Sequence, residues 1–253
     1  MGNNYLYNLG DSWAWGYSDK LGFDIPLKNT YADRVAEHFG LEKVTCCHPG
    51  WALGNAVERF LKSVYPKMTE GDCVLVTVPP DTRLVVAGKD RLGDDTTNRR
   101  TITVFSDEPM WQETVKRSGA NPYHFELILN KDLLLIASLC VHKNVKYAFQ
   151  HNYSTITHDP RWEMDLITDC YIDINNSMMD WLDFDTDKRL GDSLKAQLEE
   201  GRDGVGFTQR PDTVNDLVDE TAHPNAQGHE HIGNILTHKL EKLWNMQPTN
   251  GIN

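Results

Sequence analysis

The chain has 253 residues, of which 40% are apolar, and this length and composition fit one domain with a substantial core. Its 25 basic and 37 acidic residues give a net charge of −12, which argues against a nucleic-acid partner, because phosphate binding needs clustered lysine and arginine. No apolar run approaches the length of a membrane span, and the first strand begins too early for a secretory signal.

Strand and helix signals alternate along the chain. Asn29 or Thr30 is the expected N-cap of the first long helix, and the apolar segment 73–78 is typical of a central parallel strand. In chain order, we expect a strand at 5–9, a helix at 30–39, a strand at 43–46, a helix at 55–64, a strand at 73–78, a helix at 122–142, a strand at 146–150 and a helix at 225–244.

This alternation predicts a three-layer α/β/α fold of the flavodoxin-like kind, with helices on both faces of a parallel sheet. We expect residues 1–253 to form a single domain. Two polar stretches, at about 88–119 and 152–206, do not fit a minimal version of this fold and are expected to be insertions. Long insertions of this kind are often lids or binding loops.

Two distant segments carry the residue types needed for nucleophilic catalysis. A serine hydroxyl is a poor nucleophile at neutral pH and needs a base, usually a histidine that a carboxylate orients. Ser12 lies in a Gly-Asp-Ser turn after the strand at 5–9. His223, near the other end of the chain, has Glu220 and Asp219 three and four positions before it.

A second Gly-Asp-Ser sequence, at 191–193, provides a comparison. No strand pattern precedes it, and strong helix-forming residues follow at 194–200, so Asp192 or Ser193 is interpreted as a helix N-cap. Ligand sites in open α/β sheets lie at the carboxyl ends of strands. Ser12 is therefore the expected nucleophile, rather than Ser193.

The segments 7–13 and 220–225 resemble the first and last conserved blocks of the SGNH hydrolases, also called GDSL esterases. The order and spacing of these segments span nearly the whole chain. The resemblance implies an SGNH-type fold and hydrolysis of a carboxylic ester through an acyl-enzyme. Ser12 would be the nucleophile and His223 the base, oriented by Glu220 or, alternatively, Asp219. No cofactor is implied.

The family completes its oxyanion hole with the nucleophile's own N–H, a glycine after the second strand and an asparagine after the third. Gly50 is the expected glycine and Gly54 the alternative, although Gly50 fits a plain turn and Gly54 a close helix-to-sheet approach equally well. The third strand is followed by Pro-Pro-Asp-Thr-Arg at 79–83, without an asparagine. Arg83 or Thr77 is a candidate replacement.

The missing asparagine also supports a different class of protein. Losing one oxyanion donor costs on the order of a hundredfold in rate. The alternative is thus a slow or inactive binding or structural module with this fold, and divergent, phage-encoded members of the family are similar here. A further alternative is an acyltransferase that uses the same residues.

The remaining expectations concern the substrate and its surroundings. Trp13 and Trp15 flank the proposed nucleophile, so at least one is expected to line a pocket for a small-molecule, lipid or carbohydrate ester. No metal site is expected. His229 and His231 are two apart on a helix, with His238 further along it, and do not share a face. The aspartates at 183, 185 and 187 have the alternate spacing of a calcium loop but lack its glycine at the sixth position and its glutamate at the twelfth. Five cysteines without framework spacing indicate reduced thiols in a cytoplasmic protein, whose oligomeric state stays open.

Overall fold

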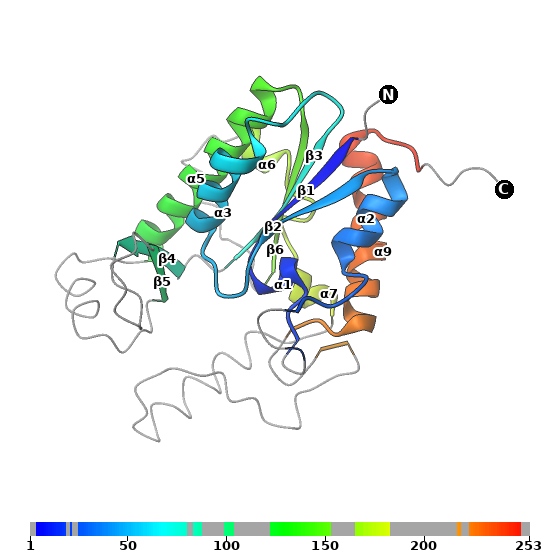
Figure 1. Ribbon diagram of the computed structural model, residues 1–253, viewed down its shortest axis with the longest axis horizontal. Helices are drawn as coiled ribbons and strands as arrows, with labels where there is room; N and C mark the ends of the chain where they lie inside the picture. Colours follow the sequence, from blue (N-terminus) through cyan, green and yellow to red (C-terminus); the bar gives the residue numbers. More distant parts are fainter. Residues whose placement is uncertain are drawn as a thin grey trace, which may run out of the picture.

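The computed structural model describes residues 4–18, 21, 25–79, 83–87, 99–103, 122–152, 165–182, 217–218 and 223–248. These residues form a sheet between two layers of helices (Figure 1). Its strands are β1 (Tyr5–Gly10), β2 (Glu42–Cys47), β3 (Cys73–Val78) and β6 (Lys146–His151). All neighbouring strands are parallel, in the order β2-β1-β3-β6. The expected three-layer α/β/α class is confirmed.

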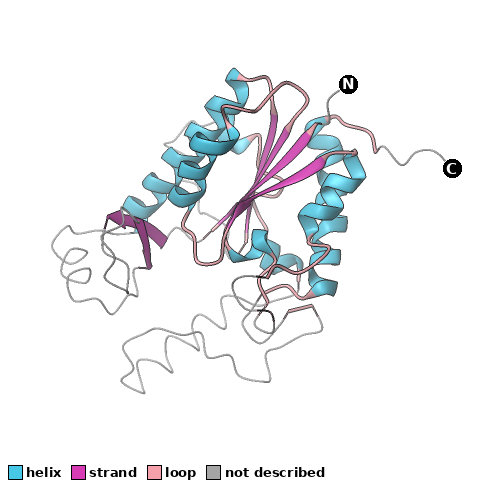
Figure 2. Ribbon diagram, viewed as in Figure 1, coloured by secondary structure: helices cyan, strands magenta, loops and turns pink. Residues whose placement is uncertain are grey.

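Two pairs of helices cover the two faces of the sheet (Figure 2). One pair is α2 (Tyr31–Phe39) and α9 (Ala226–Trp244), and the other is α3 (Leu53–Arg59) and α5 (Pro122–His142). A π-helical turn, η1 (Phe60–Val64), continues α3 and closes with the Tyr65 N–H donating to the Phe60 carbonyl oxygen at 2.9 Å. The sheet is therefore covered on both faces, as a parallel sheet requires.

The strand β3 shows why the sequence folds in this way. All six of its side chains are buried, and successive side chains point to opposite faces. Cys73 and Leu75 pack in the cluster under α2 and α9, whereas Val74, Val76 and Val78 pack in the cluster under α3 and α5. A continuous apolar run is thus divided between two cores, as the sequence predicts for a central strand.

The start of α2 settles which residue caps it. Thr30, rather than Asn29, is the N-cap. The Asp33 carboxylate accepts hydrogen bonds from the Thr30 backbone N–H at 2.8 Å and from the Thr30 hydroxyl at 2.7 Å. Lys43 of β2 pairs with the same carboxylate at 2.6 Å, so this helix terminus is also attached to the edge of the sheet.

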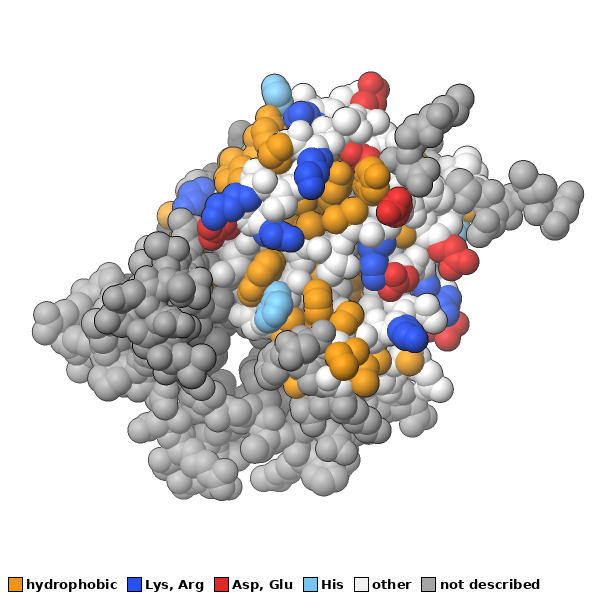
Figure 3. Space-filling model, in the orientation of Figure 1, with side chains coloured by type: hydrophobic (Ala, Val, Ile, Leu, Met, Phe, Trp, Pro, Cys, Tyr) orange, Lys and Arg blue, Asp and Glu red, His pale blue; other side chains and the backbone are white. Residues whose placement is uncertain are grey.

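Strand β2 lies at one edge of the sheet and is partly exposed. Figure 3 shows hydrophobic side chains at the surface between the two helical layers, with lysine and arginine side chains around them. Such an edge offers unpaired backbone groups to other chains. The charged residues Glu42 and Lys43 on this strand are features that limit edge-to-edge pairing.

Described residues lie within both expected insertions, whose assignment stays a prediction. The first extra element begins before residue 88, because β4 (Arg83–Ala87) pairs antiparallel with β5 (Arg99–Thr103) as a separate two-stranded sheet. Part of the second stretch belongs to the core. Ile167, Met178 and Leu182 are fully buried, and Tyr171 forms a parallel bridge with Phe149 of β6. These apolar residues were overlooked among the acidic residues that surround them.

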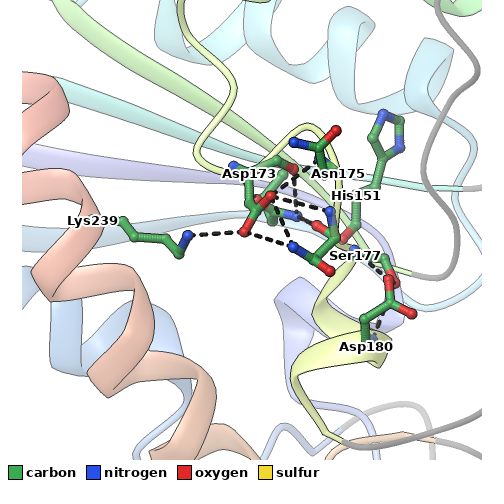
Figure 4. Close-up of polar contacts among 8 residues, drawn as sticks. His151, Asp173, Asn175, Ser177, Asp180 and Lys239 are labelled. Atoms are coloured by element: carbon green, nitrogen blue, oxygen red, sulfur yellow. Dashed lines mark hydrogen bonds and ion pairs between the residues drawn. The ribbon is translucent and has the colours of Figure 1, made fainter.

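Asp173 connects the segment 165–182 to both β6 and α9 (Figure 4). Its carboxylate accepts the Lys239 ammonium at 2.8 Å, the backbone N–H groups of Asn175 and Asn176 at 3.1 Å, and the Asn176 side-chain amide at 3.2 and 3.3 Å. The Asp173 N–H donates to Gln150 Oε1 at 2.9 Å. One half-buried carboxylate therefore fixes the loop that follows β6.

We expect Asp173→Ala to lower the free energy of unfolding at pH 7 by about 2 to 3 kcal/mol, because it removes several hydrogen bonds to a charged group. Burial raises the pKa of Asp173, but hydrogen bonds from Lys239 and Asn176 outweigh that effect and the pKa lies below its usual value. The stabilisation is therefore present above the unfolded pKa of about 3.9 and is lost as pH falls through the folded pKa.

Chemical denaturation of the variant and wild type at several pH values measures this difference. The difference in the free energy of unfolding between wild type and Asp173→Ala should become smaller below about pH 4. Glu58→Ala is the matched control, because it removes an exposed ion pair with Lys62 and should change stability by about 0.5 kcal/mol or less. A pH-independent gap for Asp173→Ala would contradict the assigned role of the carboxylate.

Candidate active site

The Gly-Asp-Ser turn lies at the carboxyl end of β1, and only glycine fits its first position. Gly10 has a φ of 146°, and a Cβ built there would lie 2.7 Å from the Thr77 carbonyl oxygen and 2.9 Å from the Cβ of Ala14. The strand end therefore approaches β3 too closely for a side chain. Ser12 follows two residues later, at the carboxyl end of a strand that lies between β2 and β3.

Ser12 begins the short helix α1 (Ser12–Trp15), and backbone contacts fix its position. The Asp11 side chain caps the helix by accepting the Trp13 N–H at 3.1 Å. The Ser12 carbonyl oxygen accepts the N–H groups of Gly16 at 3.1 Å and Tyr17 at 2.9 Å. Ser12 is only 4% exposed, so it lies within a tightly bonded turn.

The histidine expected from the sequence lies next to this serine. His223 Nε2 is 2.7 Å from Ser12 Oγ, within the distance of a good hydrogen bond. The two residues are 211 positions apart and come from opposite ends of the sequence. His223 is half-buried and stands three residues before the start of α9. The geometry that nucleophile and base require is therefore present.

His223 is held by the chain on either side of it. Pro224 forms an antiparallel bridge with Val218, and the Asn225 N–H donates to the Leu217 carbonyl oxygen at 3.0 Å. Asn225 also caps α9, where its side-chain oxygen accepts the Gly228 N–H at 3.0 Å. The Tyr17 ring meets the imidazole edge-on, with a distance of 4.7 Å between the ring centroids.

The two candidate acids, Asp219 and Glu220, lie outside the described residues. The choice between them therefore stays a prediction. The second Gly-Asp-Ser sequence, with Asp192 and Ser193, and the aspartates at 183, 185 and 187 also lie outside the described residues.

The two candidate oxyanion glycines occupy different kinds of position. Gly50 lies in an exposed turn after β2, with a φ of 79° and open space where a Cβ would be. Cys47, the last residue of β2, pairs with Gly10 in the sheet, so this turn follows the strand beside the nucleophile. Gly54 is the second residue of α3 and is half-buried. The turn at Gly50 is the better candidate, because its backbone is accessible.

The two candidate tryptophans differ in exposure. Trp13 is fully buried and packs in the core under α2 and α9, so it is not available to a substrate. Trp15 is partly exposed, and its ring lies 5.8 Å from that of the exposed His48, which in turn stacks on Trp51 at 5.8 Å. Three rings from the turns after β1 and β2 thus form an aromatic row.

The two suggested replacements for the missing asparagine also differ. Thr77 is fully buried, and its hydroxyl is hydrogen bonded to the Tyr31 hydroxyl inside the core. Arg83 is the first residue of β4, and its side chain lies outside the described part of the structure. Its position near the site therefore stays a prediction.

Two asparagines that the sequence analysis overlooked support the nucleophile turn. Asn8, a polar residue within the buried strand β1, donates from Nδ2 to the Ala14 carbonyl oxygen of α1 at 2.8 Å. Asn152 follows the last residue of β6 and donates from Nδ2 to both Asp11 carboxylate oxygens, at 3.1 and 3.0 Å. The signal for Asn152 was its place after a parallel strand, where ligand sites form.

In the part of the chain that the structure describes, the cysteines and potential metal ligands do not indicate a competing site. All five cysteines are free thiols that form no disulfide bond. Burial raises the pKa of Cys47 well above its usual value and that of Cys73 to about 12, so these thiols are not thiolates at neutral pH. Within the described ranges, no group of three or more His, Cys, Asp or Glu side chains is arranged to hold a metal ion.

Comparisons with solved structures found weak likenesses over most of the chain. A lipase/acylhydrolase from Enterococcus faecalis aligns at 12% identity and a TM-score of 0.42, covering 98% of this chain and 100% of its own. The acetyl xylan esterase AlAXEase aligns at 12% identity and a TM-score of 0.44, covering 92% and 97%. An α/β hydrolase from the metagenome of Lake Arreo, Spain, aligns at 15% identity and a TM-score of 0.43, covering 95% and 96%.

At these TM-scores the likenesses carry no argument about activity, so the functional assignment rests on the site itself. No protein-family model matches the sequence, and no curated protein matches it. The helices of the described segments include none with the length and hydropathy of a membrane span.

Proposed function

We propose that this protein is a serine hydrolase that cleaves the carboxylic ester of a small molecule, lipid or carbohydrate through an acyl-enzyme. The observation that carries the proposal is the 2.7 Å contact between Ser12 Oγ and His223 Nε2 at the carboxyl end of β1. The near-complete burial of Ser12 limits competing hydrogen bonds from water. A hydroxyl paired with an imidazole in this way is set up to act as a nucleophile.

The proposed reaction follows from this pair. His223 Nε2 takes the Ser12 proton as Oγ forms a bond to the ester carbonyl carbon, and the carbonyl electrons move onto its oxygen. The tetrahedral intermediate collapses when the bond to the alcohol oxygen breaks, and His223 returns its proton to that leaving oxygen. Water then repeats the sequence on the acyl-enzyme, releasing the acid and restoring Ser12.

Three further parts of the mechanism are proposals, of which the first two come from the resemblance. Glu220, or alternatively Asp219, would accept a hydrogen bond from His223 Nδ1 and hold the imidazole in the productive tautomer. The N–H groups of Ser12 and Gly50 would bind the oxyanion, with Gly54 as the alternative to Gly50. Arg83 would lie at the rim of the site, where its guanidinium could contribute donors.

The aromatic row indicates where the substrate would lie. Trp15 is three residues after Ser12, and Trp51 directly follows Gly50. Together with His48, these rings would present an aromatic surface beside the reacting carbonyl. We therefore assign substrate contact to Trp15 rather than to the buried Trp13.

Trapping of the acyl-enzyme tests the proposal directly. When the protein is mixed with a chromogenic ester of a short acyl chain and quenched within seconds, intact-mass spectrometry should show an adduct of one acyl group. Peptide mapping should place this adduct on Ser12, because the Ser12–His223 pair favours attack by that hydroxyl. His223→Ala should show no adduct, because the base is missing.

A folded protein that hydrolyses no ester and forms no adduct would support the binding or structural module instead. If added alcohols compete with water for the adduct and yield new esters, the protein is an acyltransferase using the same serine. An adduct on another residue would overturn the assignment of Ser12.

A further inference from the structure

Asn152 is a buried side chain from outside β1 and α1 that is hydrogen bonded to the nucleophile turn. It is 1% exposed and lies one residue beyond β6. Its Nδ2 donates to both Asp11 carboxylate oxygens, at 3.1 and 3.0 Å. Asp11 directly precedes Ser12, and a fully buried carboxylate requires such donors, because an unpaired buried charge is strongly destabilising.

The backbone of Asn152 is itself fixed from two sides. Its N–H donates to the carbonyl oxygen of Val78, the last residue of β3, at 3.3 Å. Its carbonyl oxygen accepts the N–H of Met179 at 2.9 Å, within α7 (Met178–Trp181). The amide is thus presented from the ends of two strands and a short helix. Its direction toward Asp11 is set by the packed frame of the protein.

Asp11 transmits this position to the nucleophile. Asp11 Oδ1 is one of the two carboxylate oxygens that accept the Asn152 amide. It also accepts the Trp13 N–H at 3.1 Å and so determines where α1 begins. Ser12 is the first residue of that helix. A carboxylate rotated away from Asn152 would release both the cap and the turn. Ser12 Oγ would then move relative to His223.

We infer that Asn152 is a positioning residue for the proposed ester hydrolysis, which holds the Asp11 carboxylate so that Ser12 Oγ stays within reach of His223. This inference rests on the proposed function. It assigns no contact between Asn152 and the substrate. A displacement of about 1 Å in a reacting group can cost on the order of a hundredfold in rate, so a small change at Asn152 has a large effect.

The test first changes Asn152 alone and then exchanges the side chains of Asn152 and Asp11. Asn152→Asp places a second carboxylate against Asp11 with almost no change in shape, and the two like charges repel. We expect the rate at which a fluorophosphonate labels Ser12 to fall by about tenfold to a hundredfold. For an acyl ester, kcat should fall by a similar factor while KM stays within about twofold, because substrate contacts are retained.

The double variant Asp11→Asn with Asn152→Asp restores one amide facing one carboxylate, and its labelling rate should return to within about threefold of wild type. Asn130→Ser is the matched control for loss of a buried amide, since Asn130 is a buried asparagine on α5, which packs on α3, α6 (Asp165–Thr168) and β6. Its labelling rate should be unchanged. Asn152→Ser, which removes the amide without adding charge, replaces Asn152→Asp if that variant does not fold.

The outcomes separate the two proposals. Wild-type protein that does not react with the fluorophosphonate would overturn the proposed function and the inference together. Reactive wild type with equally reactive, folded Asn152 variants would overturn the positioning role and leave the hydrolase intact. A double variant as slow as Asn152→Asp would also overturn it, because the loss would not then come from this pair.

Discussion

Ser12→Ala should lower kcat/KM for a short-chain ester by at least about a thousandfold, the loss typical of removing a serine nucleophile. Ser12 Oγ is the atom that lies 2.7 Å from His223 Nε2, so its removal leaves the imidazole with no hydroxyl to activate. The fold should be unaffected, because the change deletes one oxygen from a helix-starting residue. Steady-state kinetics and thermal unfolding of the same preparation measure both.

The chain supplies its own control for this experiment. Ser193 stands in the second Gly-Asp-Ser sequence, so Ser193→Ala removes the same atom from the same local motif. We expect wild-type kinetics for it. If Ser193→Ala were inactive and Ser12→Ala active, the nucleophile would have been assigned to the wrong copy of the motif.

Gly10→Ala is expected to have the largest effect on stability. The positive φ costs a non-glycine residue about 1 to 3 kcal/mol, and forcing an extra methyl into a packed site costs about 1 to 3 kcal/mol more. A Cβ at this position would lie 2.7 Å from the Thr77 carbonyl oxygen, which belongs to the backbone of β3 and cannot move aside cheaply. We therefore expect a loss of about 3 kcal/mol or more, measured by chemical denaturation.

The protein that remains folded should also be a poorer catalyst, because the methyl pushes the nucleophile turn away from β3. Gly71→Ala is the matched control. Gly71 also has a positive φ, of 96°, but its Cβ would meet the side chain of Asn4, which can rotate away. A loss of about 1 to 2 kcal/mol with unchanged kinetics is expected. Equal losses in the two variants would show that backbone strain, rather than the contact with Thr77, governs Gly10.

The main helices and strands were predictable because each depends on a local sequence pattern. The apolar run of β3 and a cap at Asn29 or Thr30, which the structure places at Thr30, both follow from short-range chemistry that is legible in the sequence. Predicted bounds differ from the observed ones by a residue or two, as for β6, which extends to His151. Helix and strand ends are set partly by tertiary contacts, which a local pattern does not contain.

The stretch after β6 was harder to interpret. Its acidic composition suggested an insertion, yet Met178 and Leu182 are fully buried in the core. Short helices of four residues, such as α6 and α7, carry too little periodicity to be recognised. Their burial depends on where β6 ends relative to the core, and the sequence of the segment itself does not contain that information.

The sequence by itself determined the sheet-and-helix order and the two ends of the candidate site, because Gly10, Ser12 and His223 stand in short motifs with a chemical meaning. Only the tertiary structure decided that Trp13 is buried, that Thr77 bonds to Tyr31, and that Asn152 reaches Asp11. The physical reason is that parallel strands bring residues far apart in the chain to one edge of a sheet. Which of their side chains then meet depends on register and packing, and no local pattern records either.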